Sequence, residues 1–74
     1  MTLNNAAPQT QACITEISGD VRLLTRLASI GLIPGGTITI VRNDKRRPIL
    51  VYGRDTLLAI SRKDCASIKI EEVA

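Results

Sequence analysis

The spacing of hydrophobic residues along the chain changes near residue 30. Before it, aliphatic residues recur three or four positions apart, which is the spacing of one face of a helix. The expected inner stripe of this helix is Leu23, Leu27 and Ile30, with Leu24 beside it. After it, isoleucines alternate with threonines, which is the spacing of a strand. The pattern predicts a helix over residues 21–29, capped by the carboxylate of Asp20, and a strand over residues 37–42.

Residues 30–36, rich in glycine and containing a proline, join this helix to this strand. Gly31 can take the left-handed conformation that ends a helix, because it has no Cβ to clash. Leu32 would then fold back onto Leu27, the hydrophobic contact that accompanies such a cap. The simplest interpretation of the stretch is a helix-to-strand connector. The alternative is that a corner this tight presents an exposed Ile33 to a partner.

The rest of the chain alternates short hydrophobic runs with polar turns. Further strands are expected over residues 13–17, 49–52, 57–61 and 68–71, and a single helical turn over residues 62–66. Turns at intervals of about ten residues predict a mainly β fold, a small closed or nearly closed barrel of about five strands. Residues 1–11 show no periodicity and are expected to form a flexible tail, which leaves residues 12–74 as the folded domain.

Length and charge argue against several functional classes, among them enzymes with a deep cleft, nucleic-acid binders and membrane-spanning proteins. A chain of 74 residues makes one domain, and it buries only about 60% of its unfolded surface, which leaves no room for a deep active-site cleft. The net charge of +3 favours an acidic partner but falls short of a nucleic-acid signature. We find no apolar run long enough to span a membrane and no signal peptide at the N-terminus, so a cytoplasmic location is expected.

The chain lacks the side chains that most catalytic and metal sites use. It has no histidine, and its two cysteines, Cys13 and Cys65, are far apart in sequence. Two reduced, packed thiols are expected, although the sequence leaves a single disulfide open. Tyr52 is the only aromatic ring, whereas single-strand nucleic-acid binders stack bases on several. We therefore expect no enzyme activity, no cofactor, no metal ligands and no nucleic-acid partner.

Three stretches of the sequence occur in a specific order and spacing: Leu27-x-x-Ile30-Gly31-Leu32-Ile33-Pro34-Gly35, Pro48-Ile49-x-Val51 after a charged hairpin, and residues 58–70. Together they resemble the FeoA family, small cytoplasmic companions of the ferrous-iron transporter FeoB. Cys65 stands at a position at which alanine is usual in that family. The resemblance implies an SH3-like β-barrel of about five strands with one helix inserted after the first strand. It also implies a non-enzymatic role in ferrous-iron uptake, through contact with the cytoplasmic G-protein domain of the FeoB-type transporter.

Two features that we expect to be exposed are the candidates for this contact. One is the apolar corner formed by Leu32, Ile33 and Pro34; the other is the basic tip formed by Lys45, Arg46 and Arg47. The alternative function is a divalent-metal-sensing domain, like the related barrel of iron-dependent repressors. Such a domain would need oxygen ligands here, and without histidine its affinity for Fe²⁺ would be weak. The sequence leaves the oligomeric state open.

Overall fold

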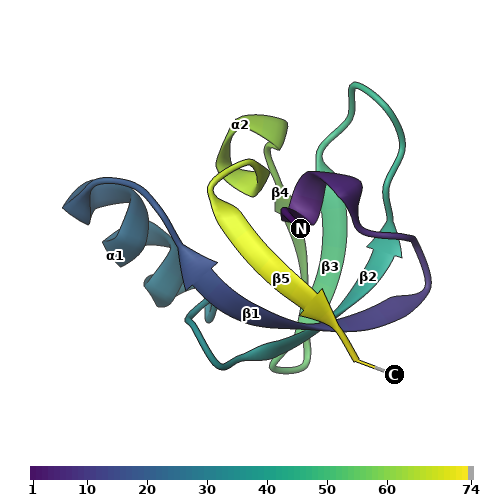
Figure 1. The fold of residues 1–74 in the computed structure, drawn as a ribbon, viewed down its shortest axis with the longest axis horizontal. Coiled ribbons are helices and arrows are strands. Elements are labelled where there is room, and N and C mark those ends of the chain that lie inside the picture. The colour runs from purple at the N-terminus through teal and green to yellow at the C-terminus, as the bar shows by residue number, and fades with distance from the viewer. Residues whose placement is uncertain (74) are drawn as a thin grey trace.

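The computed structural model describes residues 1–73, which form one five-stranded antiparallel sheet with two helices (Figure 1). The strands are β1 (Thr10–Ile17), β2 (Thr37–Arg42), β3 (Ile49–Gly53), β4 (Thr56–Ile60) and β5 (Ile68–Glu72). Helix α1 (Val21–Ser29) connects β1 to β2, helix α2 (Arg62–Cys65) connects β4 to β5, and a 3-10 turn, η1 (Leu3–Asn5), precedes β1. The positions of the elements agree with the sequence prediction from residue 13 onward.

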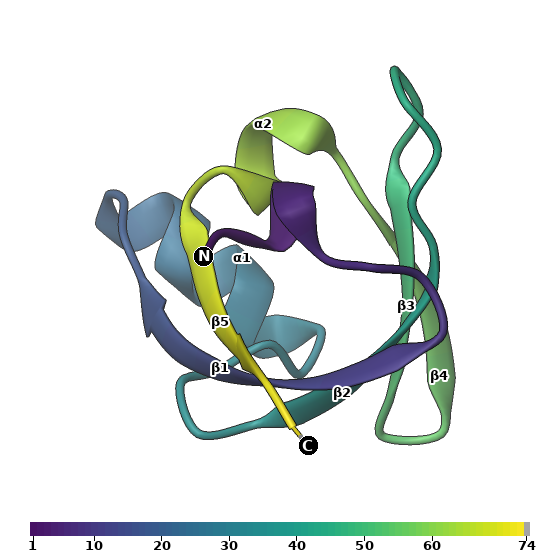
Figure 2. The ribbon, with the colours of Figure 1, turned by 45° about the vertical axis from the view of Figure 1, so that its right-hand side comes forward.

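The sheet is strongly curved but not closed. Its strand order is β4-β3-β2-β1-β5, so β4 and β5 are its two edges, and they do not pair with each other within the described residues. Figure 2 shows β1 bending beneath the N-terminal segment to lie between β2 and β5. The chain leaves β4 directly into α2, whose residues cannot join a strand ladder. The sequence predicted a closed or nearly closed barrel, and the structure shows one curved sheet whose edge strands β4 and β5 stay unpaired with each other in the described part of the chain.

The hydrophobic core fills the concave side of this sheet. Alternate residues of β2 and β3 face it, among them Ile38, Ile40, Ile49 and Val51, because successive side chains of a strand point to opposite faces. Helix α1 contributes Leu27, which is 2% exposed.

The first residues are part of the domain, contrary to the expected flexible tail over residues 1–11. The side chain of Leu3 is fully buried in the core, and the backbone N–H of Ile70 in β5 donates to the carbonyl of Met1 at 2.8 Å. Strand β1 also begins at Thr10, three residues earlier than predicted. A single buried leucine creates no periodic pattern, and β5, which the N-terminal segment contacts, lies more than sixty positions away. No local pattern in the sequence therefore indicates this packing.

Helix α1 spans Val21–Ser29, as predicted, but one residue of the expected inner stripe lies outside the core. The side chain of Asp20 accepts a hydrogen bond from the N–H of Leu23 at 2.9 Å, which confirms the N-terminal cap. Leu27 is buried and Leu23 half-buried, as the stripe predicts. Ile30, however, is 41% exposed and not part of the inner stripe, because it is the C-terminal capping residue and its backbone has already left helical geometry.

Candidate functional site

Residues 30–36 contain the predicted apolar corner, and the whole segment is called the corner from here on. It begins with a helix cap made of two backbone hydrogen bonds. The N–H of Leu32 donates to the carbonyl of Leu27 at 2.9 Å, and the N–H of Gly31 donates to the carbonyl of Ala28 at 3.0 Å. This pair of bonds defines the Schellman motif, which requires a left-handed residue at the position of Gly31. Gly31 has a φ of 94°, so the predicted role of this glycine is confirmed.

Strand β1 holds the far end of the corner in place. The N–H of Gly35 donates to the carbonyl of Ile14 at 2.7 Å, and the N–H of Ile14 donates to the carbonyl of Gly36 at 2.8 Å. Because the corner is fixed at both ends, the side chains that it exposes have defined positions before any partner arrives. Such preorganisation reduces the entropy that binding costs.

The three predicted contact residues of the corner do not share one environment. Ile33 is 38% exposed and Pro34 is also exposed, whereas Leu32 is only 2% exposed. Leu32 belongs to the core, and almost none of its side chain is exposed at the surface. Its place is taken at the surface by Ile30, which the stripe pattern had assigned to the core.

A small cavity of about 90 Å³ lies between the corner and the turn that joins β3 to β4. The corner residues Ile30 and Ile33 line one side of this cavity, and Ile38 of β2 and Arg54 of the turn line the rest. A Cβ added to Gly31 would lie 3.0 Å from Cδ of Arg54, so the arginine side chain packs directly over the glycine. Nothing in the sequence indicates this contact, because Arg54 is 23 positions from Gly31 and no motif connects them.

The basic tip lies far from the corner. Lys45, Arg46 and Arg47 are exposed in the hairpin between β2 and β3, whereas the corner leads into the opposite end of β2 (Figure 1). At about 3.3 Å per residue, β2 alone separates the two features by roughly 20 Å. The structure therefore does not bring the two predicted groups into one site.

A hydrogen-bond network that the sequence analysis missed fixes the base of the tip. The guanidinium of Arg62 in α2 donates to the side-chain oxygen of Asn43 at 2.6 Å and to the carbonyl of Arg47 at 3.0 Å. The amide of Asn43 in turn donates to the carbonyls of Asn4 and Ala6 at 3.0 and 2.7 Å. The network joins α2, the hairpin and the N-terminal segment, and so holds the hairpin in place.

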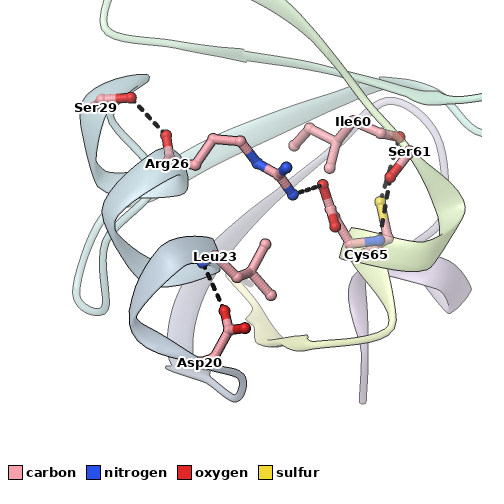
Figure 3. A network of polar contacts seen from close by, with 8 residues as sticks. Asp20, Leu23, Arg26, Ser29, Ile60, Ser61 and Cys65 are labelled. Atoms are coloured by element: carbon pink, nitrogen blue, oxygen red, sulfur yellow. Dashed lines mark hydrogen bonds and ion pairs between the residues drawn. The ribbon is translucent and has the colours of Figure 1, made fainter.

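A polar groove of about 510 Å³ separates α1 from α2. Arg26 of α1 donates to the carboxylate of Asp64 in α2 at 2.8 Å, which links the two helices across it (Figure 3). Arg22, Lys63 and Ser61 also line the groove. Its lining carries both cations and carboxylates, and one carboxylate is already paired with Arg26.

Both cysteines are free thiols, so the open alternative of a disulfide does not hold in this structure. Cys65 is buried, its Sγ lies 3.6 Å from the carbonyl of Ile60, and burial raises the pKa of its thiol to about 11. A thiol that resists ionisation is a poor nucleophile and a poor metal ligand. Cys65 therefore serves as a small apolar residue of the core.

The described part of the chain shows no group of three or more cysteine, aspartate or glutamate residues arranged to hold a metal ion. Within residues 1–73, no helix is both long and apolar enough to cross a membrane.

Comparison with known proteins identifies the family. The family model of the FeoA domain matches residues 1–72. The chain belongs to the FeoA family. This family is linked to ferrous iron transport, so the resemblance found in the sequence is confirmed. A search among curated proteins found no match.

Solved structures of FeoA proteins share this fold. The crystal structure of an iron uptake regulatory protein, FeoA, superposes with a TM-score of 0.93 at 22% identity, over 99% of this chain and 97% of that one. The zinc complex of FeoA from Stenotrophomonas maltophilia, described as a prokaryotic SH3 domain protein, gives a TM-score of 0.80 at 20% identity, over 96% of this chain and 89% of that one. These matches confirm the SH3-like fold.

The same fold also occurs inside a larger protein. The structure of ScaR with bound Zn²⁺ matches with a TM-score of 0.90 at 20% identity, and it covers 99% of this FeoA chain but only 37% of ScaR. At this level of identity the match shows a shared fold alone.

Proposed function

We propose that this FeoA chain is a cytoplasmic accessory protein of ferrous-iron uptake that acts by binding and not by catalysis. Its partner in this proposal is the cytoplasmic G-protein domain of a FeoB-type transporter. The single observation that supports a binding role most strongly is the corner, where apolar side chains are exposed on a backbone that is fixed at both ends. Membership of the FeoA family supplies the link to iron uptake.

The corner has the properties of a small binding hot spot. Ile30 and Ile33, which are 41% and 38% exposed, both line a cavity of about 90 Å³. A few apolar anchors that fill such pockets commonly supply most of the affinity of a protein interface. In this proposal an apolar side chain of the transporter enters the cavity, and Ile33 packs against it.

Electrostatics would guide the encounter of the two proteins without fixing its final geometry. The chain carries a net charge of +3, and the basic tip concentrates three cations at the end of one hairpin. Rim charges mainly change association rates and salt dependence. Because the tip is far from the corner, we assign Lys45, Arg46 and Arg47 a steering role and place the affinity at Ile33 and Pro34.

The proposal predicts the effect of one substitution. Ile33→Asp should weaken binding to the isolated G domain of the transporter by at least about tenfold, or about 1.4 kcal/mol, because it places a charge in an apolar contact. Val21→Asp is the matched control, since Val21 is 77% exposed on α1 and the change in charge is the same. Isothermal titration calorimetry measures both variants, and circular dichroism verifies that both are folded. Normal binding by Ile33→Asp would show that the docking face lies elsewhere.

No observation in the described residues favours the alternative of a metal-sensing domain. The likeness to ScaR shows the fold alone, and residues 1–73 contain no cluster of three metal-binding side chains. Titrating Fe²⁺ or Zn²⁺ into the labelled protein, with backbone NMR shifts as the readout, distinguishes the two functions. Saturable shifts at one cluster of carboxylates would favour sensing over docking.

A further inference from the structure

Strand β4 has an open edge that no other described segment covers. It pairs only with β3, in a register that runs without interruption from Gly53 opposite Thr56 to Ile49 opposite Ile60. The two turn residues between the strands both have positive φ, which is the geometry of a two-residue hairpin whose closing pair is hydrogen-bonded. Because hydrogen-bonded and non-bonded pairs then alternate along the ladder, the N–H and C=O groups of Leu57 and Ala59 point away from β3.

The two edges of the sheet are protected to very different degrees. Strand β5 carries Lys69, Glu71 and Glu72, and the N-terminal segment covers it with a bridge between Thr2 and Lys69. Strand β4 has the sequence Thr-Leu-Leu-Ala-Ile, with no charge, proline or bulge. Natural edge strands normally carry such features, because an open ladder invites pairing with another chain. An edge that lacks them is suited to pairing.

Apolar side chains extend to this edge on the outer face of the sheet. Leu57 is 57% exposed and pairs with Tyr52, which is 44% exposed. The next outward pair is Leu50 with Ala59. The outer face of β3 and β4 is therefore apolar up to the last strand, and a strand added there would continue it.

We propose that β4 pairs antiparallel with β4 of a second copy of this chain, which joins the two sheets across a two-fold axis. In this arrangement Leu57 of one copy lies opposite Ala59 of the other. The N–H and C=O groups of these two residues, which point away from β3, then hydrogen-bond to each other. The interface is isologous, since both copies contribute the same strand. The exposed Leu57 side chains become part of one continuous apolar face.

The hydrogen-bond pattern of β4 favours this antiparallel orientation. Leu57 and Ala59 each direct an N–H and a C=O group away from β3, and they are two positions apart on either side of Leu58. A two-fold axis at Leu58 therefore places each of them opposite the other residue of the second copy, so one strand is complementary to itself.

Leu57→Lys should weaken dimerisation at least tenfold, because it places a charge on the apolar face beside the open edge. Val21→Lys is the matched control and should dimerise like the unmodified chain, since it also replaces an exposed aliphatic side chain by lysine on the surface of α1. Sedimentation velocity over a series of concentrations measures all three proteins. A chain that stays monomeric up to millimolar concentration would overturn the proposal, and so would a dimer that Leu57→Lys leaves unchanged.

A measurement on the unmodified chain tests the same pairing without any substitution. Amide hydrogen exchange followed by NMR should slow at Leu57 and Ala59 as the protein concentration rises. The amides of Leu58 and Ile60, which already bond to β3, should change less. Dimerisation without added protection at Leu57 and Ala59 would place the interface on another face. Protection there only after the G domain of the transporter is added would make that partner, and not a second copy, the occupant of the edge.

Discussion

At the scale of single residues, Leu32 and Ile33 show how backbone geometry separates two similar side chains. Both are aliphatic and adjacent, and both were predicted to contact a partner. The Schellman cap turns Leu32 into the core, where it is 2% exposed, and leaves Ile33 38% exposed. The sequence predicted the cap itself, because a glycine between apolar residues at the end of a helical pattern is a local signal.

Cys65 is the residue whose environment should make stability depend on pH. Burial raises the pKa of its thiol from 9.0 to about 11, so the folded state favours the neutral form. The resulting stabilisation is fully present below pH 9 and is lost as the pH rises from 9 towards 11. The loss should reach about 2 kcal/mol relative to Cys65→Ala, which lacks the titrating group.

Urea denaturation of both proteins at several pH values between 7 and 10.5 measures this difference. Below pH 9 the gap in unfolding free energy between the two should be constant, and above pH 9 it should shrink. Parallel curves for the two proteins over the whole range would show that the thiol of Cys65 is not shielded from ionisation.

At the scale of elements, helix α1 and the strands could be predicted because each follows a local pattern of hydrophobic and polar residues. Asp20 caps α1, and the alternation of residues 37–42 defines β2, as predicted. Features that depend on contacts between residues far apart in the sequence were not predicted. Leu3 packs into the core through partners in β5, and Arg62 reaches the hairpin of Asn43, without any periodic or motif signal in the chain.

The junction between α1 and β2 gives the prediction that belongs to this scale. Gly31→Val should lower the free energy of unfolding by more than about 1 kcal/mol, since a β-branched residue resists a φ of 94°. The new side chain would also meet Cδ of Arg54, which lies 3.0 Å from the position of its Cβ. Urea denaturation at neutral pH measures the loss.

The same substitution in an Arg54→Ala background separates the two causes. If backbone strain dominates, Gly31→Val should cost nearly as much there as in the unmodified chain. An unchanged melting curve for Gly31→Val itself would contradict the left-handed cap.

At the scale of the whole molecule, strand β2 separates the two features that the sequence offered as candidate contacts. The corner and the basic tip lie at opposite ends of β2, so only one of them can be at the centre of a small interface. The number of strands was predictable because each strand is a local pattern. The pairing of the strands determines the open edges of the sheet, the cavity beside Arg54 and the distance between the corner and the tip. Local sequence patterns do not specify that pairing.

The most direct test of the corner as the docking site is an NMR titration. The unlabelled G domain of the FeoB-type transporter is added to the ¹⁵N-labelled chain, and amide shifts are followed. Docking at the corner predicts that the largest changes occur at residues 30–36 and at Gly53 and Arg54, which line the same cavity, with smaller changes at residues 45–47. Binding that leaves the amides of residues 30–36 unchanged while others shift would contradict it.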